Sequence, residues 1–553
     1  MWLVGRERRW FLYPPSAVGL AFGLLAFAAA LTPSMLPRAA LVQGVLAGVA
    51  MAAGYLVGVF LVWLWSYLEL PGADRSAERP MGGAPGLLTV AATALVAGVA
   101  LWRSVEWQNT LRALMEMPAV DLAYPLGVTL LALPVFALLL AVGRLFRLTF
   151  FAVQARIAWA VPRRVANVIA VAIAVLLFAL VSDGLLFKTG LRAFDASYAR
   201  LDQLIDPDTE PPADASKVGS AASLVDWRSL GRAGREYISG GPGRGDIEAF
   251  TGDEAMEPIR VYVGLGSAET VEDRARLALD ELIRVGGFER SLLIVAAPTG
   301  TGWLDPAAMN SLEYLAHGDV ATVAMQYSYL ASWLSLLFEP GYGAEAAHAL
   351  YKAVHDHWSA MPRDRRPKLV LHGLSLGALS SQQAIRLFDL MSNPIAGAMW
   401  AGPPFPSQHW RNATDARNPD SPAWLPRLGD GSMVRFTSQR NALGDATADW
   451  GPVRFVYLQY ASDPITFFEP SSAYREPAWM TGERGPDVSP GLRWFPFVTF
   501  LQLGVDVMIA TTTPMGYGHV YAPEHYLDAW MGVLGAGDWT PAEIDRLKRH
   551  LRG

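Results

Sequence analysis

Long apolar runs without acidic residues occupy the first third of the chain. Five of these runs approach or exceed the roughly 20 residues that a helix needs to cross about 30 Å of hydrocarbon. They cover residues 18–36, 42–68, 86–102, 125–142 and 165–181. No Asp, Glu or Lys lies inside them, although transport pathways and proton relays usually carry such residues. The pattern predicts an all-α bundle of about five transmembrane helices that acts as an anchor rather than as a transporter.

From about residue 259 the pattern changes to short strand-like runs that alternate with helical segments. The predicted strands cover 260–264, 291–297, 320–327, 368–371, 397–401 and 453–460, and the predicted helices cover 270–284, 344–359 and 380–391. This alternation is typical of a mostly parallel sheet covered by helices on both faces. We therefore predict a doubly wound α/β domain over 259–553. A linker over 189–258, with one short amphipathic helix at 224–238, joins it to a transmembrane domain over 1–188.

Composition supports two chemically different halves. The chain is 52% apolar and only 17% charged, which indicates membrane-buried sequence. Residues 1–190 carry a net charge of +6 and the rest of the chain carries −12. An acidic second half argues against nucleic acid as a partner, because phosphate binding needs a dense basic surface. The absence of cysteine excludes disulfides, thiolate metal sites and a cysteine nucleophile, and we expect no metal and no cofactor.

The distribution of arginine orients the predicted bundle, because short loops rich in Lys and Arg stay in the cytoplasm. With five spans, ten arginines precede the first span or lie in predicted cytoplasmic loops, and only Arg38, Arg103 and Arg112 lie in outer loops. We therefore expect a multi-pass protein of the cytoplasmic membrane with its N-terminus inside. Because the number of spans is odd, the α/β domain is predicted on the extracytoplasmic side.

A G-x-S-x-G motif runs from Gly373 to Gly377, with Ser375 at its centre. The predicted strand 368–371 leads directly into it and a predicted helix leads directly out. This strand–turn–helix setting is that of a nucleophile elbow, in which glycines permit a turn tight enough to lift the serine hydroxyl above the sheet edge. We predict Ser375 as the nucleophile and the α/β-hydrolase fold for the domain. The alternative is an ordinary turn between a strand and a helix.

The oxyanion that forms when a serine attacks a carbonyl needs two N–H donors held in place. One predicted donor is the amide of Leu376, directly after the nucleophile. The second is predicted at Thr299 or Gly300, in the glycine-rich loop after the strand 291–297. A glycine turn at 264–266 competes for this role but follows a different strand.

A catalytic serine also needs a histidine base, and the base needs a carboxylate that holds its tautomer. In hydrolases with such an elbow the order along the chain is Ser, acid, His. We predict His519 as the base, since it lies in a glycine-flanked loop that opens a C-terminal helix; His525, inside that helix, is the alternative. We predict Asp463 as the acid because it follows the strand 453–460 and precedes a proline. A structural turn residue is the alternative for Asp463, and Asp445 and Asp449 are weaker candidates for the acid.

Two further apolar segments, 327–338 and 491–510, flank the predicted catalytic residues in the sequence. The second resembles a sixth span, but a crossing there would place His519 and Ser375 on opposite sides of the membrane. Both segments are explained as core helices. Alternatively, they are cap or interfacial elements that admit an acyl chain from the bilayer, with Trp333 and Phe500 in contact with the substrate.

The order of these parts resembles a bacterial family of multi-span α/β-hydrolases, which join an N-terminal membrane region to a C-terminal hydrolase domain. The resemblance rests on the segments 372–377, 462–464 and 518–521, and covers nearly the whole chain. It implies a Ser-His-Asp triad and little about the substrate. We expect a membrane-anchored esterase, lipase or phospholipase that acts on a lipid-like ester. An acyltransferase and a non-catalytic membrane platform are the alternatives, and the oligomeric state stays open.

Overall fold

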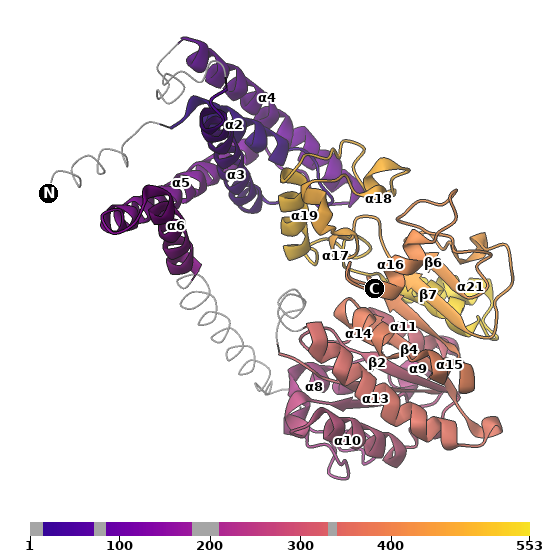
Figure 1. Ribbon diagram of the computed structural model, residues 1–553. Helices are drawn as coiled ribbons and strands as arrows, with labels where there is room; N and C mark the ends of the chain where they lie inside the picture. The colour runs from indigo at the N-terminus through magenta and orange to yellow at the C-terminus, as the bar shows by residue number, and fades with distance from the viewer. Residues whose placement is uncertain (1–14, 71–83, 180–209, 330–339) are drawn as a thin grey trace. The chain divides into compact units, whose positions relative to one another are not determined.

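The computed structural model describes residues 15–70, 84–179, 210–329 and 340–553 (Figure 1). The chain divides into two compact units. The helical unit comprises Met1–Ala193, Glu469–Met480 and Val488–Asp506, and the sheet unit comprises Phe194–Phe468, Thr481–Asp487 and Val507–Gly553. Two segments of the C-terminal half therefore belong to the helical unit, whereas the sequence pattern placed everything after residue 258 in one domain.

The described N-terminal residues of the helical unit form five helices, and each predicted apolar run lies largely on one of them. They are α2 (Ala17–Ala30), α3 (Ala40–Tyr67), α4 (Ala84–Leu114), α5 (Tyr124–Ile157) and α6 (Arg163–Ala179). Helices α3, α4 and α5 are 28, 31 and 34 residues long and apolar enough to cross a membrane. Helix α2, with 14 residues, is shorter than the roughly 20 that a span needs, and the described part of α6 has 17 residues. The described residues thus contain three candidate spans rather than the predicted five.

Large apolar side chains face outward along these helices. Trp63, Leu95 and Leu130, for example, are 54%, 70% and 64% exposed. An outward face this rich in apolar side chains is suited to lipid rather than to water. The helical unit therefore has the surface of a membrane domain.

Glycines bring the helices of this unit into close contact. A Cβ at Gly54 of α3 would lie 2.5 Å from the carbonyl oxygen of Phe22 in α2. On the side that faces α5, a Cβ at Gly48 would lie 2.7 Å from the carbonyl oxygen of Ala132. Small residues that let backbones approach are the usual means of helix association in membranes, where burial of apolar surface gives little driving force.

Helix α19 (Val498–Met508) from the C-terminal half packs against α2 and α3 inside the helical unit. Its Val498 lies in an apolar cluster with Ala30 and Leu46, and Leu501 and Val505 extend the contact. With 11 residues α19 is about 16 Å long, too short to cross a membrane. The described helix in the segment 491–510 is therefore too short for a span, and the segment belongs to the helical unit up to Asp506 and to the sheet unit from Val507.

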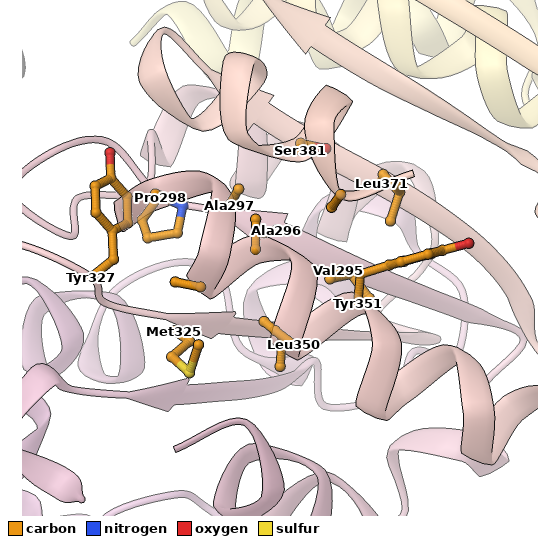
Figure 2. A pocket seen from close by; sticks show the side chains of 14 residues that line it. Val295, Ala296, Ala297, Pro298, Met325, Tyr327, Leu350, Tyr351, Leu371 and Ser381 are labelled. Atoms are coloured by element: carbon orange, nitrogen blue, oxygen red, sulfur yellow. The ribbon is translucent and has the colours of Figure 1, made fainter. Parts of the chain in front are cut away.

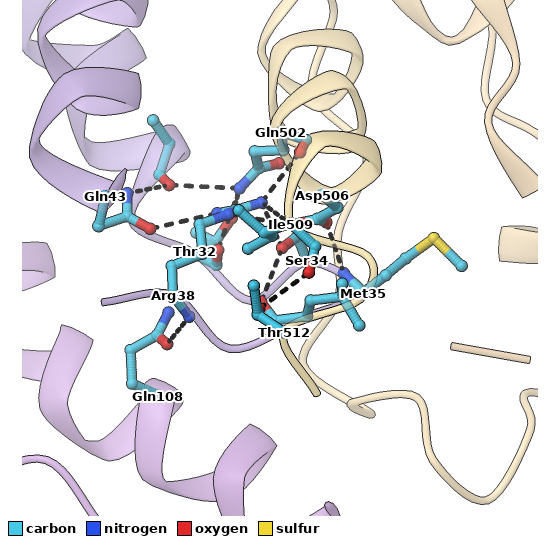
Figure 3. A network of polar contacts seen from close by, with 12 residues as sticks. Thr32, Ser34, Met35, Arg38, Gln43, Gln108, Gln502, Asp506, Ile509 and Thr512 are labelled. Atoms are coloured by element: carbon cyan, nitrogen blue, oxygen red, sulfur yellow. Dashed lines mark hydrogen bonds and ion pairs between the residues drawn. The ribbon is translucent and has the colours of Figure 1, made fainter. Parts of the chain in front are cut away.

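A buried ion pair accompanies this apolar contact (Figure 3). Arg38, in the loop between α2 and α3, lies 2.8 Å from an oxygen of Asp506 on α19, and both side chains are fully buried. The other donors and acceptors of the pair are also satisfied within the unit, through Ser34, Met35, Gln43 and the Gln502 carbonyl. Such saturation is what makes a buried pair tolerable in a medium of low polarity.

The described part of the sheet unit contains seven parallel strands in the order β1-β3-β2-β4-β5-β7-β6, flanked by helices (Figure 1). The strands are β1 (Ile259–Val263), β2 (Leu292–Ala297), β3 (Val320–Met325), β4 (Lys368–Leu374), β5 (Gly397–Ala401), β6 (Val434–Thr437) and β7 (Arg454–Leu458). Strands β2 and β3 are buried throughout, as expected for a parallel sheet covered on both faces. The predicted α/β architecture is confirmed. The sequence missed β6, a four-residue edge strand that is only partly buried.

The helices of the sheet unit begin at polar caps in several places, including Thr270, Asp305 and Thr540, whose side chains accept backbone amides. These helices are α8 (Gly231–Ser239), α9 (Arg244–Thr251), α10 (Val271–Arg284), α11 (Pro306–Leu315), α13 (Pro340–Ala360), α14 (Leu376–Ala384), α15 (Leu387–Ser392), α16 (Gln408–Asp415), α17 (Pro464–Phe467), α20 (Pro523–Leu534) and α21 (Pro541–Arg552). The predicted helix 380–391 is thus two helices, α14 and α15. Part of the predicted linker forms α8 and α9, and Gly234 of α8 packs on Tyr262 of β1.

Candidate active site

Ser375 lies in a tight turn between β4 and α14, near the middle of the sheet. Its backbone angles are φ 56° and ψ −125°, a conformation that non-glycine residues rarely adopt and that costs about 1–3 kcal/mol. The Ser375 amide donates to the carbonyl of Ala401 at 3.0 Å, which fixes the turn to the end of β5. A Cβ at Gly373 would lie 2.3 Å from the Gly377 backbone, and one at Gly377 would lie 2.1 Å from the Ala297 carbonyl oxygen. Close backbone contacts therefore require both glycines of the motif.

Asp463 lies just beyond β7, next to β5 in the sheet, and its carboxylate is fully buried. The backbone amide of Ile465 donates to its Oδ1 at 2.9 Å, which fixes the carboxylate at the start of α17. Its Oδ2 accepts from the hydroxyl of Tyr521 at 2.6 Å and lies 2.7 Å from Nδ1 of His519. A carboxylate accepts only, so His519 carries its proton on Nδ1 and presents Nε2 as a proton acceptor.

Nε2 of His519 is buried and makes no hydrogen bond with any residue that the structure describes. A Cβ at Gly402 would lie 2.6 Å from Cε1 of the same ring, and Gly402 has a φ of +48°, which favours glycine. Gly402 directly follows Ala401, whose carbonyl holds the Ser375 amide. The imidazole therefore adjoins Gly402 and the serine turn adjoins its neighbour Ala401, at the end of β5.

A second buried carboxylate supports the loop that carries His519. Oδ2 of Asp487 accepts from the hydroxyl of Ser462 at 2.6 Å and from the side-chain amide of Gln439 at 2.7 Å. The Ser462 hydroxyl in turn accepts from the Gly518 amide at 3.0 Å. This chain of hydrogen bonds joins the residue before Asp463 to the residue before His519. Burial raises the pKa of Asp487, and its two side-chain donors oppose that effect.

The sequence pattern did not single out Gly402, Tyr521, Asp487 or Gln439 as contributors to this site. Two of these residues could have been found from their neighbours in the sequence, because Tyr521 lies two positions after His519 and Gly402 directly follows the predicted strand 397–401. Asp487 and Gln439 could not, since only the folding of distant segments brings them to the loop that carries His519.

The sequence matches models of a known family. The model of the alpha/beta-hydrolase family matches residues 259–547, and the model of the alpha/beta-hydrolase family N-terminus matches residues 31–242. The chain belongs to the alpha/beta-hydrolase family. It has no match among curated proteins or among solved structures. Membership supports a hydrolase-type function and agrees with the parallel sheet, and the two matched regions follow one another in the order expected from the sequence.

The oxyanion donors expected in this hydrolase differ in their surroundings. Leu376 is the first residue of α14, and the first amides of a helix have no acceptor within the helix. The Thr299 amide instead donates to the carbonyl of Trp303 at 3.0 Å, inside its own loop. Thr299 is therefore engaged in the turn that shapes the loop, and the assignment of the second donor to Thr299 or Gly300 stays a prediction.

Other predicted residues have other partners or belong to the helical unit. His525 on α20 is held by the Tyr460 hydroxyl, 2.6 Å from its Nδ1, which gives it a structural partner. Phe500 lies on α19 and belongs to the helical unit. Trp333 lies outside the described residues. Within the ranges that the structure describes, no group of three or more acidic or histidine side chains is arranged to hold a metal ion.

A small cavity lies behind the elbow, between the sheet and the helices α13 and α14 (Figure 2). Its lining includes Ala297 and Pro298 at the end of β2, Tyr327 after β3, and Ser381 on α14. The volume is about 10 Å³, room for about one water molecule. This cavity does not accommodate an acyl chain.

Asp305 is a buried carboxyl close to the catalytic candidates. Its Oδ1 accepts the Ala307 amide at 2.9 Å and its Oδ2 accepts the Tyr526 hydroxyl at 2.9 Å. Burial raises the pKa of Asp305 from 3.8 to about 6, and the two hydrogen bonds and His519 oppose that rise. Folding therefore favours the protonated form of Asp305.

Replacing Asp305 with asparagine should remove a pH dependence of stability. As pH rises from 3.8 to about 6, the unfolded chain loses the Asp305 proton before the folded chain does, so the wild-type protein loses stability over this window. The shift corresponds to about 3 kcal/mol. The free energy of unfolding of Asp305→Asn relative to wild type, measured from pH 3.5 to 7, should rise by about that amount across the window. A difference that stays flat with pH would contradict the raised pKa.

Proposed function

We propose that the protein is a membrane-anchored serine hydrolase that acts on carboxylic esters through an acyl-enzyme at Ser375. The observation that carries the proposal is the 2.7 Å contact between His519 Nδ1 and Asp463. Nε2 of the same ring makes no hydrogen bond with any described residue, and the ring lies beside the end of β5, where the Ala401 carbonyl accepts from the Ser375 amide. Serine hydrolases need this order of groups, because Nε2 must accept the serine proton while the carboxylate stabilises the resulting imidazolium.

The reaction follows from these positions. Nε2 of His519 takes the proton of Ser375 as Oγ attacks the ester carbonyl, and the amides of Leu376 and of Thr299 or Gly300 stabilise the oxyanion. The tetrahedral intermediate collapses, the C–O bond to the alcohol breaks, and His519 returns its proton to the departing alkoxide. A water molecule, deprotonated by the same nitrogen, then releases the acid and restores the serine. Transfer to an alcohol instead of water would use the same acyl-enzyme.

The proposed substrate is a lipid-like ester that reaches the enzyme from the membrane. Three candidate spans and the outward apolar surface of the helical unit support this. A non-catalytic membrane platform is the contrasting function. A fluorophosphonate probe on the purified full-length protein separates the two, because only an activated serine forms the adduct. Labelling with one probe per chain is expected, and an unlabelled, folded protein would contradict the proposal.

Selectivity among esters should follow acyl-chain length. Burial of each CH₂ contributes about 0.8 kcal/mol, so four more methylenes contribute roughly 3 kcal/mol and should raise kcat/KM by more than about a hundredfold. The measurement is kcat/KM for p-nitrophenyl esters of two to sixteen carbons below their aggregation limits, with Phe500→Ala alongside. A maximum at acetate or butyrate, unchanged by that substitution, would favour a small-ester hydrolase instead.

We also propose that the catalytic domain lies on the extracytoplasmic side of the cytoplasmic membrane. The support is the ten-to-three bias of arginine between inner and outer loops, which holds when all five apolar runs cross the membrane. A periplasmic-type reporter fused after Gly553 should therefore be active, and a cytoplasmic-type reporter should be silent. The reverse pattern would overturn the orientation without touching the catalytic proposal.

A further inference from the structure

A groove of about 520 Å³ lies between α3 and α5 in the helical unit. The residues that line it on α5 recur every three or four positions from Phe136 to Phe151, and those on α3 run from Val49 to Val59. Such spacing places them on one face of each helix. The volume is within the range of sites that enclose a small organic molecule.

The groove exists because the two helices touch at one end and separate toward the other. Near the start of both helices, a Cβ at Gly44 would lie 2.6 Å from Leu131, and Gly48 makes a similar contact with Val135. Pro134 then lies inside α5, where proline removes a backbone hydrogen bond and bends a helix. Further along, a Cβ at Gly143 would meet nothing within 4 Å, although Gly143 lines the groove.

The open end of the groove is basic and the rest is apolar. Arg144 and Arg147 line it one helical turn apart, and the Arg147 guanidinium lies 5.5 Å from the ring centroid of Phe151. Arg144 follows Tyr124, the first residue of α5, by 20 positions, which is about 30 Å of helix and about the thickness of the hydrocarbon layer. The two arginines therefore lie at the depth of lipid headgroups, while the apolar part of the groove lies at the depth of acyl chains.

We infer that this groove binds an anionic glycerophospholipid, with one acyl chain between α3 and α5 and its phosphate at Arg144 and Arg147. Guanidinium groups bind phosphate oxygens in pairs, and basic pockets between membrane helices select anionic headgroups. The residues of this groove are not those of the candidate active site, and the inference does not depend on the proposed hydrolysis.

The test measures phospholipid binding to the full-length protein in detergent micelles by native mass spectrometry. Dioleoylphosphatidylglycerol should bind at least about tenfold more tightly than dioleoylphosphatidylcholine, and Arg144→Gln/Arg147→Gln should abolish that preference. Arg156→Gln is the matched control, since Arg156 is an exposed arginine in the last turn of the same helix outside the groove, and it should leave the preference unchanged. Equal binding of both lipids to the wild type, or an undiminished preference in the double variant, would overturn the inference.

A second variant tests the apolar part of the site without altering its charge. Gly143→Leu should fold normally, because the space beside Gly143 is open, and should lower the affinity for the anionic lipid about tenfold or more by filling the groove. Soluble glycerophosphate should not bind, since it lacks an acyl chain. Binding of glycerophosphate as tightly as the lipid, or full lipid affinity in folded Gly143→Leu, would show that the groove holds no acyl chain.

Discussion

Replacing Ser375 with alanine should abolish labelling by a fluorophosphonate and lower kcat by about 10⁴-fold or more. The residual rate would come from substrate binding and from the amides that stabilise the oxyanion. The variant should stay folded, because alanine removes only the hydroxyl from a residue whose turn is held by backbone contacts. The measurement combines probe labelling with ester hydrolysis by the purified full-length protein. Labelling at wild-type stoichiometry would exclude Ser375 as the nucleophile.

Two glycine-to-alanine variants test whether the position of the His519 imidazole matters for catalysis. Gly402→Ala should displace the His519 imidazole, because the new Cβ would lie 2.6 Å from Cε1 and the φ of +48° disfavours alanine. A misplaced base should lower kcat about a hundredfold or more while the serine remains present. Gly444→Ala is the matched control, since a Cβ there meets nothing within 4 Å. If both variants kept wild-type kcat, His519 would not act at the position that the structure gives it.

Local signals made much of the candidate site predictable from the sequence. Gly373 is required by a backbone contact within the turn, with Gly377, and Gly377 by a contact with the end of β2, so the spacing of the two glycines identifies the turn. Asp463 follows a strand and precedes a proline, and the structure places it 2.7 Å from His519, although the catalytic roles of both remain a prediction. The Thr299 amide could not be assigned in the same way, because its acceptor depends on how the loop closes on Trp303.

The features of the fold and site that the sequence did not predict depend on contacts between distant residues or on the length of a helix or strand. The histidine loop relies on Asp487, which lies 32 positions before His519 and belongs to no motif. Strand β6 is short and only half-buried, so its apolar pattern is weak. Apolar composition located five helices, and within the described residues three of them are long and apolar enough to span a membrane.

Within the helical unit, we expect the largest loss of stability from a substitution of a polar residue when Arg38 or Asp506 is replaced and their ion pair is broken. Asp506→Asn or Arg38→Met leaves one charge buried and uncompensated, which costs about 3–5 kcal/mol, or roughly 10 °C in Tm. The exposed pair Arg103–Glu106 on α4 offers a matched control, because Arg103→Gln should cost less than about 1 kcal/mol. Thermal unfolding of the full-length protein in detergent measures each change.

The double variant Arg38→Met/Asp506→Leu distinguishes the cost of an orphaned charge from the value of the pair itself. Apolar replacements of both partners are often neutral, so this variant should recover most of the stability lost in either single variant. The activity of the double variant tests a separate point, the effect of α19 on catalysis. Asp506 lies on α19, and the chain runs only 13 residues from there to His519, so a displaced α19 should lower kcat in the single variants and the double variant should restore it. Additive losses of stability in the double variant would mean that Arg38 and Asp506 act independently, and the pair would then not be what holds α19 to the membrane helices.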